Sequence, residues 1–231
     1  MNVGIMYSGG KDSTFAVDWA KTNGHDVRWL LSVKPTRNDC YLYHYATVEH
    51  TPILAGILGI PHKLITCDVA EPTAEANLAR DVIKTMEKVD AVILGGTGLQ
   101  ETQIGSLKMA LAQLGIKVFA SHQGKDHGDV MREMLAKGYR FVITQIAADG
   151  LNKDDLGREL TADYLETFFK RSERYGFHNG GDGGVYDTLT IDGPMFDKAI
   201  DVTITDKVME SVCAGHAVCS VKVAQKIAVK R

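Results

Sequence analysis

The feature that most constrains the fold is a short polar loop near the start of the chain. Residues 8–13 read SGGKDS and stand between an apolar run, Val3–Tyr7, and a helical stretch, Asp12–Thr22. Glycines let a backbone turn sharply and approach a ligand without a Cβ in the way. Consecutive N–H groups at a helix start, together with a lysine and two serine hydroxyls, form a cradle for a phosphate. The loop therefore predicts an anion site at the end of a first β-strand.

The pattern of this loop argues against two alternatives. A Walker A loop requires GxxxxGK followed by Ser or Thr, and the chain has no such pattern, so the common P-loop nucleoside triphosphatases are excluded. A serine-capped turn whose glycines serve only packing would have no need of Lys11. The residues thus favour phosphate binding over a purely structural turn.

The chain before Gly124 alternates short apolar runs with longer amphipathic ones, which is typical of βαβ units around a parallel sheet. We expect strands at Val3–Tyr7, Val27–Val33, His62–Cys67, Ala91–Leu94 and Lys117–Ala120. We expect helices at Asp12–Thr22, Thr47–Leu58, Thr73–Lys88 and Glu101–Leu114. The pattern predicts an α/β fold with a Rossmann-like parallel sheet.

The pattern of apolar and amphipathic segments changes after Gly124. We expect helices at Asp129–Lys137 and Thr161–Tyr175, and strands at Arg140–Ile146, Asp201–Thr205 and Val218–Val229. The chain is therefore expected to form two domains. Residues 1–124 would carry the phosphate loop, and residues 125–231 would form a smaller α+β domain that binds the substrate.

Composition narrows the class of protein. The formal net charge of -3 argues against a broad basic face, so stable nucleic-acid binding is not expected. No apolar run reaches the ~18 residues that span a bilayer, and the N-terminus lacks the basic region of a signal peptide, so we expect a cytoplasmic protein without membrane contact. The four cysteines show no CxxC pair, which suggests neither a zinc site nor a dithiol redox motif; they are Cys40, Cys67, Cys213 and Cys219.

The SGGKDS string at the end of the first strand resembles the signature of the PP-loop, N-type ATP pyrophosphatases of the adenine nucleotide alpha hydrolase-like superfamily. A glycine-rich segment at residues 178–188, HNGGDGGVYDT, precedes DGPMF at residues 192–196. With DCYLYH at residues 39–44 and LGIP at residues 58–61, these segments resemble the diphthine–ammonia ligase family over nearly the whole chain.

The resemblance implies a ligase that uses ATP and Mg²⁺. In that reaction ATP adenylates the carboxylate of diphthine, a modified histidine of translation elongation factor 2, and ammonia displaces AMP to give diphthamide. A carboxylate is a poor electrophile for ammonia until it carries a good leaving group, which AMP supplies. The resemblance therefore implies elongation factor 2 as the protein partner and ammonium as the second substrate, and it leaves a homo-oligomer open.

The resemblance, together with the position of loops at the carboxyl ends of parallel strands, assigns three groups of residues. Catalysis is expected from Lys11, Asp12 and Ser13. Nucleotide binding is expected from Tyr7, Ser8, Gly9, Gly10, Lys11, Asp12, Ser13, Ser32, Val33, Gly95, Gly96 and Thr97. Acceptor binding is expected from His44, Gly181, Asp182, Gly183, Gly184, Tyr186 and Asp187. The metal ligands stay unassigned.

The glycine-rich segment departs from the family pattern, which has glutamates where this chain has Asp182, Val185 and Asp187. The side chain of Val185 cannot accept a hydrogen bond or hold an amine. Three alternatives to the ligase stay open, and the departure at Val185 favours the second of them. They are a tRNA-modifying PP-loop enzyme that adenylates a base, a diverged paralogue with another acceptor, and an ATP-binding regulatory module without turnover.

Overall fold

The chain divides into two units, Met1–His127 and Gly128–Arg231, and each is described by itself. The computed structural model describes residues 1–37, 39–43 and 46–226. Within these ranges, no helix combines the length and the apolar character that crossing a membrane requires.

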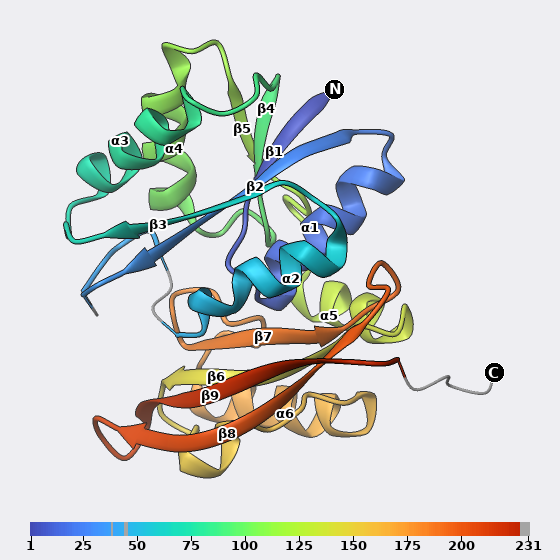
Figure 1. The fold of residues 1–231 in the computed structure, drawn as a ribbon. Coiled ribbons are helices and arrows are strands. Elements are labelled where there is room, and N and C mark those ends of the chain that lie inside the picture. The colour runs from blue at the N-terminus through green and yellow to red at the C-terminus, as the bar shows by residue number, and fades with distance from the viewer. Residues whose placement is uncertain (38, 44–45, 227–231) are drawn as a thin grey trace. The chain divides into compact units, whose positions relative to one another are not determined.

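The first unit is a parallel β-sheet with helices on both faces (Figure 1). Its strands are β1 (Asn2–Met6), β2 (Asp26–Pro35), β3 (His62–Cys67), β4 (Ala91–Leu94) and β5 (Lys117–Ala120), in the spatial order β3-β2-β1-β4-β5. Its helices are α1 (Lys11–Thr22), α2 (Thr51–Leu58), α3 (Pro72–Ile83) and α4 (Glu101–Ala112), and Val48–His50 form a 3₁₀ turn, η1. The expected α/β fold with a Rossmann-like sheet is confirmed.

Successive side chains of a strand point to opposite faces of the sheet, so an apolar layer forms on each face. Met6 and Trp29 pack in one cluster with residues of α3 and α4, which lie side by side in Figure 1. The neighbouring positions Ile5 and Leu30 are fully buried and face the opposite side, which α1 and α2 cover. Burial on both faces explains why these strands are apolar runs without polar alternation.

The strand order determines where a ligand can bind. From β1 the chain moves outward to β2 and β3, and it then returns to the other side of β1 for β4 and β5. In such sheets, ligands bind at the carboxyl ends of the two strands where the order reverses. These strands are β1 and β4, so the SGGKDS loop and the loop that follows Leu94 lie at the same edge.

The second unit is an antiparallel sheet with helices. Its strands are β6 (Arg140–Ala147), β7 (Tyr186–Asp192), β8 (Ala199–Met209) and β9 (Ala214–Ala224), in the spatial order β7-β6-β9-β8. The remaining elements are α5 (His127–Ala136), the 3₁₀ turn η2 (Lys153–Asp155) and α6 (Ala162–Tyr175). Phe168 of α6 packs edge-on against Phe177 and Tyr186, with ring centroids 5.5 and 5.3 Å away. This aromatic group joins α6 to the sheet.

Two expected helices differ from the structure by more than two residues at one end. The helix expected at Thr73–Lys88 ends at Ile83, because the chain then turns more tightly, with Met86 N donating to Ile83 O at 3.0 Å. The helix expected at Thr47–Leu58 begins later, as η1 and α2, because Thr47 has a φ of 64° in the left-handed region.

The sheet of the second unit is more extensive than the sequence indicates. No strand was expected at Tyr186–Asp192, which forms β7 directly after the glycine-rich segment. β8 and β9 form a hairpin that extends beyond the expected Asp201–Thr205, and the end of the expected strand Val218–Val229 lies outside the described residues. Threonines and aspartates between the apolar residues weaken the local strand signal here.

Candidate functional site

The loop after β1 is held by its own serines. Gly9 has a φ of 79°, a left-handed conformation that favours glycine. Ser13 Oγ donates to Gly10 O at 3.1 Å and accepts a hydrogen bond from Ser8 N at 3.2 Å. Gly10 N donates to Ser8 Oγ at 3.3 Å. The two serines therefore fix the turn that leads into α1.

The loop lysine belongs to a chain of three charged or titratable groups. Nζ of Lys11 lies 2.6 Å from Oδ2 of Asp12, and Oδ1 of the same carboxylate lies 2.8 Å from Nε2 of His127. Both Lys11 and His127 are buried. Burial acts to raise the pKa of Asp12, but the charge of Lys11 and the contact with His127 outweigh it, so that pKa lies below its usual value. Asp12 is therefore ionised at neutral pH and holds the lysine.

The loop after β4 lies against the first turn of α1. A Cβ placed on Gly95 would lie 2.3 Å from the carbonyl carbon of Asp12 and 2.4 Å from Ser13 N, so no side chain fits there. Oγ1 of Thr97 and Oε1 of Gln100 are buried in this loop and have no hydrogen-bond partner among the described residues. Buried polar atoms normally have partners, so these two are available to a ligand.

The turn after β5 completes this edge of the sheet. His122 N donates to Gly96 O at 3.1 Å, and Gly124 N donates to Thr97 O at 2.9 Å. The His122 ring stacks on Phe15 of α1, with centroids 4.7 Å apart and planes at 6°. The loops after β1, β4 and β5 thus form one connected structure, which brings the predicted glycines and Thr97 to the phosphate loop.

The predicted residues from β2 and the end of β1 have their side chains engaged within the unit. Ser32 Oγ donates to Tyr7 O at 2.5 Å and lies 2.8 Å from Nε2 of His62. The Tyr7 hydroxyl lies 3.3 Å from Oγ1 of Thr14, and burial raises the pKa of Tyr7. Val33 packs in the apolar cluster under α3 and α4. These side chains therefore contribute to the packing of the strands that carry the loop.

A buried carboxylate fixes the segment after β2. The two side-chain oxygens of Glu75, which is fully buried in α3, accept hydrogen bonds from Tyr41 N at 2.9 Å and from Leu42 N at 2.8 Å. Gln103 of α4 donates to Leu42 O. The predicted acceptor residue His44 follows this segment and lies outside the described residues.

The second glycine-rich segment is a turn of the second unit, between α6 and β7. His178 Nδ1 accepts hydrogen bonds from Gly180 N at 3.2 Å and from Asp182 N at 3.3 Å. The Tyr186 hydroxyl donates to Asn179 O at 2.6 Å. The predicted residue Tyr186 therefore stabilises this turn from within the core.

The other predicted residues of this segment differ in exposure. Gly181 has a φ of 87°, and a Cβ there would lie 2.8 Å from the carbonyl oxygen of Tyr186. Gly183 and Gly184 are exposed, and no atom lies near a Cβ placed on either. Asp187 is buried in β7. Gly183 and Gly184 are thus the most exposed residues of the turn, and Gly181 and Asp182 are partly exposed.

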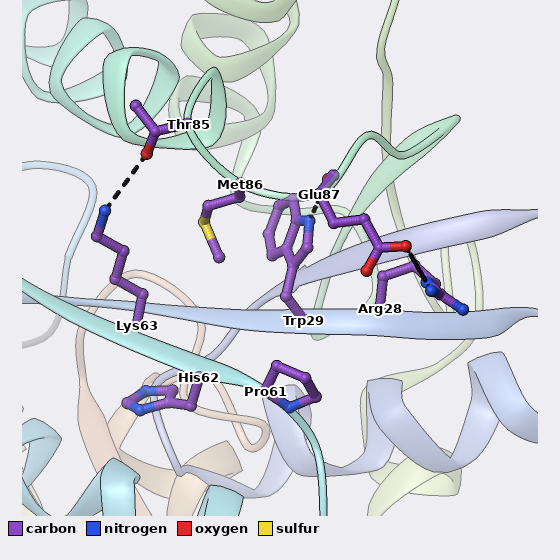
Figure 2. A pocket seen from close by; sticks show the side chains of 8 residues that line it. All are labelled: Arg28, Trp29, Pro61, His62, Lys63, Thr85, Met86 and Glu87. Carbon is purple, nitrogen blue, oxygen red and sulfur yellow. Dashed lines mark hydrogen bonds and ion pairs between the residues drawn. The ribbon is translucent and has the colours of Figure 1, made fainter.

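A hollow of about 270 Å³ opens at the opposite edge of the first sheet, where β2 and β3 begin (Figure 2). Lys63 Nζ donates to Thr85 Oγ1 at 3.4 Å across it, and Trp29 Nε1 donates to Glu87 O at 2.8 Å. These polar groups satisfy one another, as the dashed contacts of Figure 2 show. The hollow lacks the glycines and the helix start that the loop edge offers.

The loop edge has the chemistry of a site for a phosphorylated ligand. The N-terminus of α1 attracts an anion, and Lys11 supplies a buried positive charge beside it. The sequence analysis assigned this lysine and the glycines to the predicted site, but it gave no role to His127 or Gln100. Neither of these residues belongs to a local motif, so no signal in the sequence points to them.

Comparison with known proteins covers both units. The family model described as diphthamide synthase N-terminal domain matches residues 1–118, and the model described as diphthamide synthase C-terminal domain matches residues 126–227. A Mus musculus protein named diphthine–ammonia ligase is 28% identical over an alignment of 236 residues that covers 93% of this chain and 87% of that protein. A Danio rerio protein of the same name is 27% identical over 232 residues, covering 91% of this chain and 90% of that protein. A Homo sapiens protein of that name is 27% identical over 236 residues, covering 93% and 87%.

Proposed function

The chain belongs to the diphthamide synthase family, and on this premise we propose that it is an ATP-dependent ligase that converts the carboxylate of diphthine on elongation factor 2 into an amide. ATP would adenylate the carboxylate with release of pyrophosphate, and ammonia would then displace AMP. The observation that carries this proposal is the connected edge of loops around Lys11, of which the loops after β1 and β4 lie within the matched N-terminal domain.

Lys11 and the N–H groups at the start of α1 would hold the phosphates of ATP and stabilise the charge on the departing pyrophosphate. In the free protein the ammonium of Lys11 lies 2.6 Å from Asp12. Phosphate oxygens would therefore compete with Asp12 for Lys11, and His127 would keep the carboxylate in place. Mg²⁺ would neutralise further phosphate charge, and the phosphates would hold it, because both oxygens of Asp12 already face Lys11 and His127.

The loop after β4 would contact the rest of the nucleotide. A threonine hydroxyl both donates and accepts, and an amide oxygen accepts two hydrogen bonds. The buried atoms Thr97 Oγ1 and Gln100 Oε1 therefore match hydroxyl groups such as those of ribose. We assign acceptor binding to the glycine-rich turn of the second unit, and we expect the ligase to act in the cytoplasm, where elongation factor 2 functions.

The test is to measure AMP and pyrophosphate formed from Mg-ATP and ammonium, with elongation factor 2 that carries diphthine or lacks the modification. The proposal expects AMP release that requires the modified factor, together with conversion of its carboxylate to an amide by mass spectrometry. Equal release with both factors would reject diphthine as the acceptor. Replacement of the factor by tRNA tests the alternative of base adenylation, and the absence of AMP in every reaction would favour a nucleotide-binding module.

A further inference from the structure

Two cysteines that are distant in the sequence meet at one carbonyl oxygen of the first unit. Cys40 Sγ donates to Val69 O at 3.1 Å, and Cys67 Sγ donates to the same oxygen at 3.5 Å. The sulfur atoms are therefore no farther apart than the sum of these two distances, and Cys67 is close enough to contribute to the raised pKa of the Cys40 thiol. The sequence suggested no dithiol, because the two residues form no short motif.

We propose that Cys40 and Cys67 are an oxidisable dithiol, which closes to a disulfide when a peroxide reaches Cys40. Cys67, the last residue of β3, is fully buried, whereas Cys40 is partly exposed in the segment after β2. The oxidant therefore meets Cys40 first, and Cys67 is the resolving thiol. This inference is independent of the proposed ligase activity.

The reaction proceeds in two steps. The Cys40 sulfur attacks one oxygen of the peroxide, so that an S–O bond forms, the O–O bond breaks and water or an alcohol leaves. The Cys67 sulfur then attacks the sulfenic sulfur of Cys40, so that the S–S bond forms, the S–O bond breaks and water leaves. The two thiol protons end in the released molecules, and two electrons pass from the sulfurs to the peroxide.

The surroundings of Cys40 make the disulfide slow to form and difficult to reduce. Burial raises the pKa of the Cys40 thiol to about 12, and the nearby Cys67 and Glu75 contribute to this rise. Thiolate is the attacking species, so formation is slow at neutral pH. Because the reduced Cys40 gains no stability from thiolate formation at neutral pH, the disulfide resists reduction. Such a pair is unsuited to sulfur transfer, which requires a reactive thiolate.

The backbone around the pair is fixed on both sides. Tyr41 N and Leu42 N donate to the buried Glu75, and Thr36 N donates to Cys67 O at 2.8 Å. The disulfide would join the segment after β2 to the end of β3, at the same sheet edge as the phosphate loop.

The test uses the full-length protein, which is reduced, treated with hydrogen peroxide, blocked with iodoacetamide, digested and examined by mass spectrometry. The expected product is a linked pair of peptides containing Cys40 and Cys67, lighter by two hydrogens than the separate thiol peptides. The link should be lost in C40S and C67A and kept in C219S, and it should become rare when peroxide is added in concentrated urea.

Two outcomes would overturn the proposal. One is that Cys40 and Cys67 are recovered from the folded protein as blocked thiols or as separate sulfinic acids. The other is that Cys40 links to Cys213 or Cys219 as often as to Cys67. The partly exposed position of Cys40 makes C40S the variant of choice if C67A does not fold.

Discussion

Nε2 of His127 lies 2.8 Å from Oδ1 of Asp12, although 115 residues separate the two in the chain. The other oxygen of Asp12 contacts Nζ of Lys11 at 2.6 Å. His127, which follows the last strand of the first sheet, therefore orients Lys11 of the phosphate loop through the carboxylate of Asp12. The position of the loop lysine therefore depends on a residue outside the SGGKDS motif.

Replacing Lys11 by Ala is expected to lower kcat/KM for pyrophosphate release by about 100-fold or more, because one preorganised group on a developing charge contributes on that order. The matched control is Lys21→Ala, which removes an exposed lysine from the same helix and is expected to leave the rate unchanged. Circular dichroism checks that both variants fold. Full turnover in the Lys11 variant would exclude the loop from the site.

Replacing His127 by Ala leaves the Asp12 carboxylate with one of its two contacts. A hydrogen bond to a charged group contributes about 1.5–3 kcal/mol, so kcat/KM should fall by about 10-fold or more, mainly through a higher KM for ATP. His127→Gln retains an N–H donor and should recover most of the loss. Equal losses in the two variants would show that the histidine does more than hold Asp12.

Asp12 links the stability of the first unit to pH. Its folded pKa lies below its ordinary value of 3.8, so its contribution is fully present above that pH and is lost as the pH falls through the folded pKa. Asp12→Asn should therefore lower the free energy of unfolding at about pH 6, and the difference from the wild type should shrink below about pH 4. Urea unfolding followed by circular dichroism measures this difference. A difference in the free energy of unfolding that increases as the pH falls would contradict the contacts assigned to Asp12.

Gly95→Ala places a Cβ 2.3 Å from backbone atoms of α1. Overpacking against the backbone costs about 1–3 kcal/mol, so the melting temperature should fall and ATP turnover should be lost with it. Gly105→Ala in α4 is the matched control, because no atom lies within 4 Å of its added Cβ. That change should stabilise the helix by about 0.5–1 kcal/mol. Equal melting temperatures for the two variants would argue against the close contact.

The Cys40 thiol should show an unusual pH profile with iodoacetamide. A thiol of ordinary pKa, 9.0, approaches its full alkylation rate above that pH, whereas a pKa of about 12 keeps the rate rising beyond it. The rate at Cys40 should therefore be low at neutral pH and still increase past pH 9.0. Peptide mass spectrometry after timed labelling gives the rate. A plateau near pH 9.0 would show that burial does not act on this thiol.

Local sequence signals were sufficient for most of the first unit. The strands at His62–Cys67, Ala91–Leu94 and Lys117–Ala120 have the bounds that were expected, because short runs with β-branched or apolar residues between turn residues are typical of strands. β7 was missed, since Tyr186–Asp192 combines a preceding glycine cluster with polar residues on both faces. Its strand conformation depends on pairing with β6, which a local pattern does not contain.

In the candidate site, too, local features could be predicted from the sequence and contacts between distant residues could not. The glycines, serines and lysine of the loop act within a few residues of one another, so their spacing could be interpreted directly. The roles of His127 and Cys67 depend on contacts with residues distant in the chain. Ser32 was expected to contact a nucleotide, which stays a prediction. Its hydroxyl contacts Tyr7 O and His62, and the sequence does not reveal these partners because they come from other strands or their ends.

The division of the chain into two units has a consequence for spectroscopy. The chain has two tryptophans, Trp19 and Trp29, and both belong to Met1–His127. Intrinsic tryptophan fluorescence therefore reports on the first unit alone. Far-ultraviolet circular dichroism, in contrast, reports on the helices and strands of both units. A single denaturation series recorded with both signals would measure, without any attached dye, how far the antiparallel unit unfolds on its own.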